Sequence, residues 1–204
     1  MARPRTALLT RERIARAAIA LVDSGHELQV MPLAKRLGVS VSSIYHHVNG
    51  RVGIIHAMRE VLVNEHPLTP DPKASWEDTV RSSALHLWHL YGNHPRVMPL
   101  LVSVVIDEPV TLDFYAVLVD ALAEAGIPEH EQLSTAETIE AFIFGVALDA
   151  GSPDTIFQPT NRHPRMEQLI AAHPQGRARN VQLFERGLEL LLLGIRERAR
   201  IATP

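Results

Sequence analysis

The sequence has no cysteine, which excludes disulfide bonds, thiolate catalysis and cysteine metal ligands. It has no apolar run near the roughly 20 residues that a membrane-spanning helix requires. Charged residues recur through positions 11–16 and leave no uninterrupted apolar core for a signal peptide. A length of 204 residues with 46% hydrophobic content nevertheless allows a sizeable buried core. These features predict a cytoplasmic globular protein.

Catalytic and cofactor-binding motifs are missing as well. The chain has no G-x-S-x-G, no phosphate-cradling glycine loop and no H-E-x-x-H, since His130-Glu131 lacks a second histidine. His86 and His89 lie three residues apart on one predicted helix, with His94 nearby, a spacing that suggests a metal site. The apolar face of that helix, however, leaves some of these histidines in solvent. The sequence therefore predicts no catalytic residue, no metal and no cofactor. An enzyme with an unrecognised site is the alternative.

The most informative stretch is LAKRLGVSVSSIYHHVNGR, residues 33–51, whose spacing predicts a helix-turn-helix. Gly38 suits the left-handed backbone at a helix end, and Ser40 can cap the next helix. Ile44 and Val48, four residues apart, predict the buried stripe of that second helix. An ordinary αα-hairpin uses the same glycine and cap and remains the alternative.

The outward positions of the predicted second helix favour DNA binding. They carry small or polar groups and one phenol, which can contact base edges and phosphates. These residues are Val41, Ser42, Ser43, Tyr45, His46 and His47.

Charge is distributed unevenly along the chain. Residues 1–59 hold nine Lys and Arg against three Asp and Glu, a net charge of +6, whereas the remainder holds 11 against 20, a net charge of −9. A basic head on an acidic body is typical of a small polyanion-binding module joined to another domain. The basic segment includes residues 1–9, predicted to be a loose arm.

The rest of the chain reads as helical. Thr10 and Gly25 bound a predicted amphipathic helix that completes a three-helix head. Further helices are predicted over residues 51–66, 75–91, 95–106, 109–126, 133–150, 165–172 and 178–202, with a loop over 151–164. No strand-like alternation persists. The sequence thus predicts an all-α fold with a DNA-binding head (residues 1–50), a connecting helix (51–66) and a larger ligand-binding and dimerisation domain (67–204).

With these elements placed, the chain resembles the tetracycline-repressor (TetR) family of bacterial transcription regulators. The resemblance is carried by RERIARAAIALVDSG, by LAKRLGVSVSSIYHHV and most specifically by residues 44–48, IYHHV. Phe142, Gly145, Leu148 and Asp149, and the run GLEL at 187–190 with Gly194, resemble the tetracycline-responsive branch.

The resemblance implies roles for the DNA-reading residues. Ser42 and Ser43 take base-facing positions, Val41 faces a thymine methyl group, and Tyr45 and His47 take phosphate-binding positions. Arg51 stands at the place of a phosphate-clamping lysine. The predicted DNA-binding set is Ser40, Val41, Ser42, Ser43, Tyr45, His46, His47 and Arg51.

The family also implies a homodimer that pairs through the helices over 133–150 and 178–202. The stretch LFERGLELLLLGI is more apolar than one buried face requires, and Gly187 and Gly194 would let two helices approach closely. A helix buried in its own chain is the alternative. The residues predicted for dimerisation are Phe184, Leu188, Leu191, Leu192 and Ile195.

A small-molecule effector is the last implication. Asp149 matches the acid of the family's tetracycline–magnesium site. The other metal-binding positions of that site fall near Leu101 and Val102, which cannot bind a metal, so a tetracycline–magnesium site is not expected. Asp149 is instead expected to cap its helix or to form an ion pair near the helix end. The predicted effector is mainly hydrophobic or aromatic because the candidate residues are so; the alternative is that they fill the core. They are Leu62, Leu87, Trp88, Tyr91, Met98, Leu101, Phe114, Leu118, Phe142 and Phe144.

The predicted function is a ligand-responsive repressor that binds a pseudo-palindromic operator as a dimer. A dimeric small-molecule or protein-binding module that does not read DNA is the alternative from another class.

Overall fold

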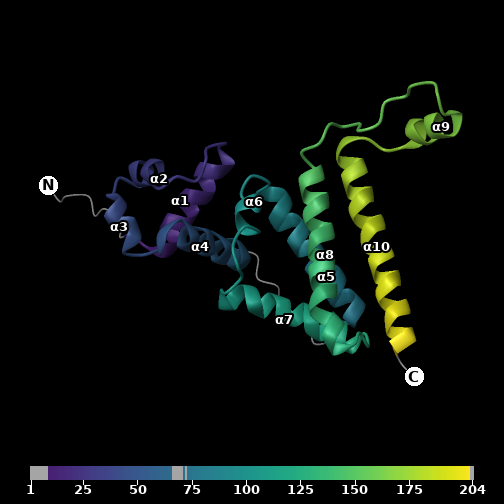
Figure 1. The fold of residues 1–204 in the computed structure, drawn as a ribbon, viewed down its shortest axis with the longest axis horizontal. Coiled ribbons are helices and arrows are strands. Elements are labelled where there is room, and N and C mark those ends of the chain that lie inside the picture. Colours follow the sequence, from purple (N-terminus) through teal and green to yellow (C-terminus); the bar gives the residue numbers. More distant parts are fainter. Residues whose placement is uncertain (1–8, 66–70, 72, 203–204) are drawn as a thin grey trace. The chain divides into compact units, whose positions relative to one another are not determined.

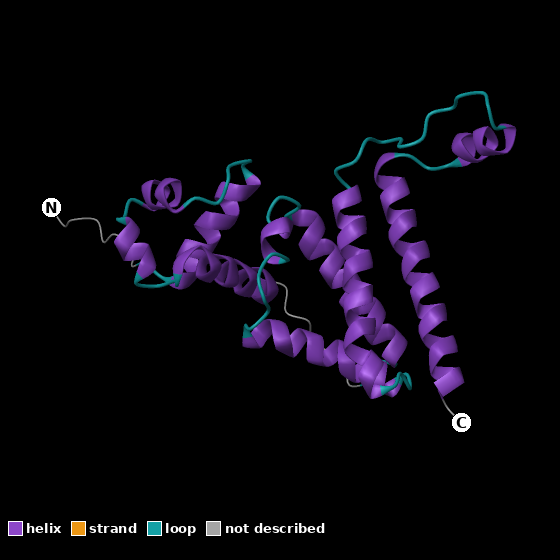
Figure 2. Cartoon of the chain, in the orientation of Figure 1, coloured by secondary structure: helices purple, strands orange, loops and turns teal. Residues whose placement is uncertain are grey.

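The computed structural model describes residues 9–65, 71 and 73–202, and these contain ten helices and no strand (Figure 1 and Figure 2). The all-α prediction is confirmed. The helices are α1 (Arg11–Asp23), α2 (Val30–Leu37), α3 (Val41–Tyr45), α4 (Gly50–Glu65), α5 (Trp76–Asn93), α6 (Met98–Leu101), α7 (Pro109–Glu124), α8 (Glu129–Asp149), α9 (Pro164–Ala172) and α10 (Gly176–Ala202). None of these helices is long and apolar enough to span a bilayer. The predicted basic arm lies, except for residue 9, outside the described residues.

The described helices belong to two compact units. The first unit holds α1 to α4 together with residues 94–113, which include α6 and the first turn of α7. The second unit holds α5, the rest of α7, and α8, α9 and α10. Residues 94–113 thus pack with the N-terminal helices although the whole of α5 precedes them in the chain.

Local capping explains where the first helices begin and end. Thr10 Oγ1 accepts a hydrogen bond from the backbone N–H of Arg13 at 3.1 Å, so it caps α1 as predicted. Gly25 follows α1 with a φ of 90°, a left-handed backbone that glycine tolerates. Ile14 and Ala18 of α1, Leu33 of α2 and Ile55 of α4 are fully buried and form the centre of the first unit.

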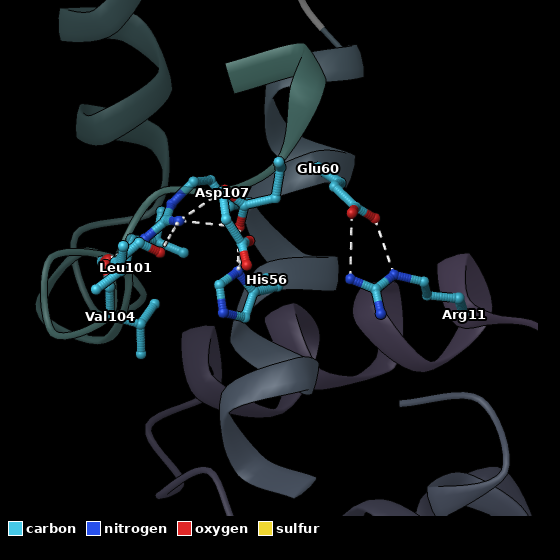
Figure 3. A network of polar contacts seen from close by, with 9 residues as sticks. Arg11, His56, Glu60, Leu101, Val104 and Asp107 are labelled. Carbon is cyan, nitrogen blue, oxygen red and sulfur yellow. Dashed lines mark hydrogen bonds and ion pairs between the residues drawn. The ribbon is translucent and has the colours of Figure 1, made fainter. Parts of the chain in front are cut away.

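Helix α6 is much shorter than the helix predicted over residues 95–106, so that prediction is wrong. At the C-terminal end of α6 the chain meets Arg59 of α4, whose guanidinium donates hydrogen bonds to the carbonyl oxygens of Leu101, Val104 and Val105 and to the carboxylate of Glu108 (Figure 3). A buried arginine needs acceptors on several sides. The carbonyls that would continue α6 are turned towards Arg59, and the helix ends at Leu101.

The second unit is organised by contacts of α8 with α5 and α10. Gly187 of α10 lies against Phe142 of α8 so closely that an added Cβ would stand 2.2 Å from the ring. Trp88 of α5 stacks on Phe184 of α10 with ring centroids 4.3 Å apart and 9° between the planes. The close helix approach predicted at Gly187 is therefore present inside one chain, between α8 and α10.

Candidate nucleic-acid interface and ligand-binding residues

Helices α2 and α3 form the predicted helix-turn-helix. Gly38 ends α2 with a φ of 68°, and its N–H and that of Val39 return to carbonyls of α2. Ser40 Oγ accepts a hydrogen bond from the N–H of Ser43 at 3.1 Å and so caps α3. Ile44 and Val48 are buried, as the spacing predicted, but α3 ends at Tyr45, so Val48 lies beyond the helix to which it was assigned. Ile44 fixes which side of α3 faces outward.

The predicted DNA-reading residues lie on α3 and in the turn that follows it, and they are exposed to different degrees. Ser42, Tyr45, His46 and His47 are exposed, whereas Val41 is half-buried. Ser43 is also half-buried, and its hydroxyl lies 2.8 Å from that of Ser40. Ser40 and Ser43 thus already serve the cap of α3. Ser42 is the serine best placed to meet a base edge.

Arg51 lies in the first turn of α4 and is exposed. It lines a surface hollow of about 310 Å³ together with Tyr45 of α3 and Met31 of α2. Apolar side chains, those of Leu28, Val30, Met31 and Ile54, make up most of the lining, and Arg51 and Tyr45 supply groups that can contact a phosphate at its edge. The structure therefore brings Arg51 and Tyr45, six residues apart in sequence, to one surface.

The positive charge of the head is smaller than the count over residues 1–59 suggests. Arg11 pairs with Glu60 at 2.9 Å (Figure 3). Arg16 pairs with Glu65, so two acids just beyond that segment neutralise two of its cations. Arg59 is buried. Lys35, Arg36 and Arg51 are exposed cations of α2 and α4. Sequence reasoning missed these ion pairs because each joins α1 to α4 across 49 residues.

The predicted effector-binding residues divide between the units. Leu62, Met98 and Leu101 belong to the first unit and are buried. Of those in the second unit, Leu87, Tyr91, Phe114 and Leu118 are buried, and Trp88, Phe142 and Phe144 are half-buried. Two of the half-buried rings, Trp88 and Phe142, pack on α10 through Phe184 and Gly187.

A cavity of about 300 Å³ lies in the second unit where α5 ends, α8 ends and α10 begins. The residues that line it include Trp88, Asp149 and Arg179. Of the residues predicted to bind the effector, Trp88 lines this cavity. Asp149 accepts hydrogen bonds from Arg179 at 2.9 Å and from the Asn180 side chain at 3.2 Å. Burial raises the pKa of Asp149, but these hydrogen bonds and the charge of Arg179 outweigh burial and hold the pKa below its ordinary value. The expected role of Asp149, pairing near the end of its helix, matches these contacts.

The residues predicted for dimerisation face inward. Phe184, Leu188, Leu192 and Ile195 are buried within the unit, and Leu191 is half-buried. The exposed apolar side chains of α10 are instead Leu183, Leu190, Leu193 and Ile201. The reason is that α10 carries two apolar stripes. Other helices of the same chain cover the stripe that was predicted to contact a second protomer.

Comparison with known proteins places this arrangement in a family. A family model described as the tetracycline repressor-like C-terminal domain matches residues 69–199. A 140-residue stretch, 68% of the chain, is 25% identical to an HTH-type transcriptional regulator of Saccharopolyspora erythraea, and the match spans 59% of that relative's length.

Solved structures share the fold over nearly the whole chain. Apo ActR from Streptomyces coelicolor has a TM-score of 0.81 and 20% identity, covering 97% of this chain and 99% of that one. BioQ with its natural double-stranded DNA operator has a TM-score of 0.69 and 18% identity, covering 93% and 99%. The family model covers more than half of the residues. The chain therefore belongs to the TetR family of DNA-binding transcription regulators, which is not a family of enzymes.

Proposed function

We propose that this chain binds a pseudo-palindromic operator as a homodimer and releases it when a small, mainly apolar or aromatic effector binds. The observation that carries the proposal is the exposed surface of α3, where Ser42, Tyr45 and His46 project from a helix that is capped by Ser40 and anchored by Ile44. A helix held in this way can enter a major groove with its side chains presented to base edges.

The DNA-binding roles are divided between two kinds of contact. Ser42 reads a base edge, and Val41 offers an apolar contact to a thymine methyl group. Tyr45, His47 and Arg51 contact phosphates, with Arg51 and Tyr45 holding the same strand through their shared hollow. Phosphate contacts set the position of the reader and the salt dependence of binding, whereas base contacts set the sequence.

The dimer contact follows from the second apolar stripe of α10. Leu183, Leu190 and Ile201 are spaced by 7 and 11 residues, which places them on one face of the helix, and each is at least 42% exposed. Exposed apolar side chains of this size in a row mark an interaction surface. Two-fold pairing then gives the protein two readers, as a pseudo-palindrome requires.

An effector can release the operator only if it binds the state with low DNA affinity more tightly than the other state. The preference for a hydrophobic or aromatic molecule rests on the apolar residues predicted from the sequence, of which Trp88 lines the cavity of the second unit. Other chains with this fold are known with small molecules, among them ActR in complex with (S)-DNPA.

The salt dependence of operator binding tests the proposed reader. Arg51→Ala is expected to weaken binding to every sequence alike and to lower the slope of log K against log salt by about one per subunit contact. Arg162→Ala removes the same charge from an exposed loop of the second unit and serves as the control. If Arg51→Ala behaves like Arg162→Ala, Arg51 does not contact a phosphate and the proposed reading face is wrong.

A further inference from the structure

Three potential metal ligands converge in the first unit, where α4 passes the segment that leads into α7. His56 Nδ1 lies 2.9 Å from Asp107 Oδ1 and 2.8 Å from Glu108 Oε1. One donor atom from each residue lies within 4.8 Å of the other two, and among the described residues no other group of three His, Asp or Glu is so arranged. Figure 3 shows the imidazole of His56 directly below the Asp107 carboxylate. We propose that His56, Asp107 and Glu108 bind a divalent transition-metal ion, with zinc as the best match.

A single hydrogen on His56 cannot serve both carboxylates fully. The Nδ1 of an imidazole carries at most one hydrogen, so it cannot donate a full hydrogen bond to both carboxylates. A divalent cation between the three groups is bound by the nitrogen lone pair and by an oxygen of each carboxylate at once. With metal–ligand bonds of about 2.0–2.2 Å in a tetrahedral site, the donors must separate by about half an ångström or slightly more. The Asp107 side chain is 72% exposed and has room to move.

The surroundings of Glu108 prepare it as a ligand. Its side chain is 1% exposed, and both of its oxygens accept hydrogen bonds from Arg59 at 2.8–2.9 Å. Arg59 thus orients the carboxylate, as partners behind a ligand commonly do in metal sites.

The net charge and the types of donor atom limit which ion the cluster can hold. Asp107, Glu108 and Arg59 together carry one net negative charge when His56 is neutral. The donor set of one nitrogen and two oxygens suits zinc and its neighbours in the first transition row, whereas magnesium and calcium prefer oxygen alone. The exposed side of Asp107 leaves a coordination position open to water. Solvent can therefore reach the bound ion, and the ion can exchange. The positive charge of Arg59 lowers the affinity for a cation below that of a closed structural metal site.

The proposal does not depend on operator binding and is tested by metal binding alone. Full-length protein, stripped of metal with a chelator, is titrated with zinc chloride by calorimetry and with cobalt(II) by visible absorption. One ion per chain is expected. Loss of a residue that only hydrogen-bonds a metal ligand already weakens metal binding by roughly 10- to 100-fold. His56→Gln and Asp107→Asn, which remove ligands, should each weaken zinc binding by at least that much.

His130→Gln is the matched control, because His130 is 79% exposed and has one carboxylate, that of Glu131, at 3.4 Å. It should leave the affinity and the cobalt spectrum unchanged. Asp107→Asn lies at an exposed position, so melting curves in chelator should match the wild type even if His56→Gln folds poorly. The proposal is overturned if wild-type protein shows no saturable binding, or if Asp107→Asn binds zinc as tightly as the wild type.

Discussion

The sequence does not reveal the partners of the two buried arginines. Arg59 and Arg179 are each about 5–6% exposed, one in each unit. An unpaired buried charge would cost several kcal/mol, so each arginine is held by a carboxylate distant in sequence, Glu108 or Asp149. Arg59 in addition donates hydrogen bonds to backbone carbonyls at the point where α6 ends. Periodicity along the chain does not show such contacts.

The Asp149–Arg179 pair makes the stability of the second unit dependent on pH. Because the folded pKa of Asp149 lies below its ordinary value of 3.8, the pair stabilises the fold above that pH. This stabilisation is lost as the pH falls through the folded pKa. Asp149→Asn should lower the free energy of unfolding at pH 7 by about 3 kcal/mol, the low end for breaking a buried pair, and should weaken its pH dependence below about pH 4.

Chemical denaturation at several pH values measures both effects. Asp120→Asn, a change of the same kind at an exposed position of α7, should leave the profile unchanged. An Asp149→Asn variant with the stability and the pH profile of the wild type would show that the pair contributes nothing.

At the scale of elements, the contact of α8 with α10 depends on one missing side chain. A Cβ at Gly187 would stand 2.2 Å from Phe142 Cε2, closer than packed atoms can come. Gly187→Ala should therefore destabilise the protein by about 1–3 kcal/mol despite the better helix propensity of alanine. Phe142→Leu in the same chain should recover part of the loss, since the shorter side chain makes room.

Thermal unfolding of the single and double variants checks this contact. Gly92→Ala is the control, because a Cβ at Gly92 of α5 meets no atom within 4 Å. It should be neutral or slightly stabilising. Equal effects of Gly187→Ala and Gly92→Ala would mean that α8 and α10 are not packed as described.

The sequence predicted the existence of the elements better than their contacts. Caps at Thr10 and Ser40, the turn at Gly38 and the buried pair Ile44 and Val48 are local features, and the structure confirms them. Other features depend on distant partners: Arg59 lies at the point where α6 ends, and α5 and α8 cover the stripe of α10 that was predicted for dimerisation. A helix with two apolar stripes does not show in its own sequence which one its chain will cover. Similarly, His56 and Asp107 are 51 residues apart, so no spacing motif reveals their contact.

At the scale of the whole molecule, the exposed stripe of α10 should hold the dimer together. Leu190 is 62% exposed and Leu192 is fully buried. Leu190→Glu should give a folded monomer with much weaker operator binding, whereas Leu192→Glu should unfold because it buries a charge in the unit's own core. Sedimentation and circular dichroism distinguish the two outcomes.

Leu85→Glu is the matched control for that prediction, since Leu85 of α5 is an exposed leucine outside the proposed interface. It should remain dimeric. A dimeric Leu190→Glu variant would remove the α10 stripe from the interface.

The most direct test of DNA reading is selection of binding sites from a randomised pool of duplex DNA by the wild type and by Ser42→Ala. The wild type should enrich a pseudo-palindrome whose half-sites are centred about one helical turn apart. Ser42→Ala should relax the preference at symmetry-related positions of both half-sites and leave the spacing unchanged. Enrichment of no motif, or of a single half-site without symmetry, would contradict dimeric reading of an operator by α3.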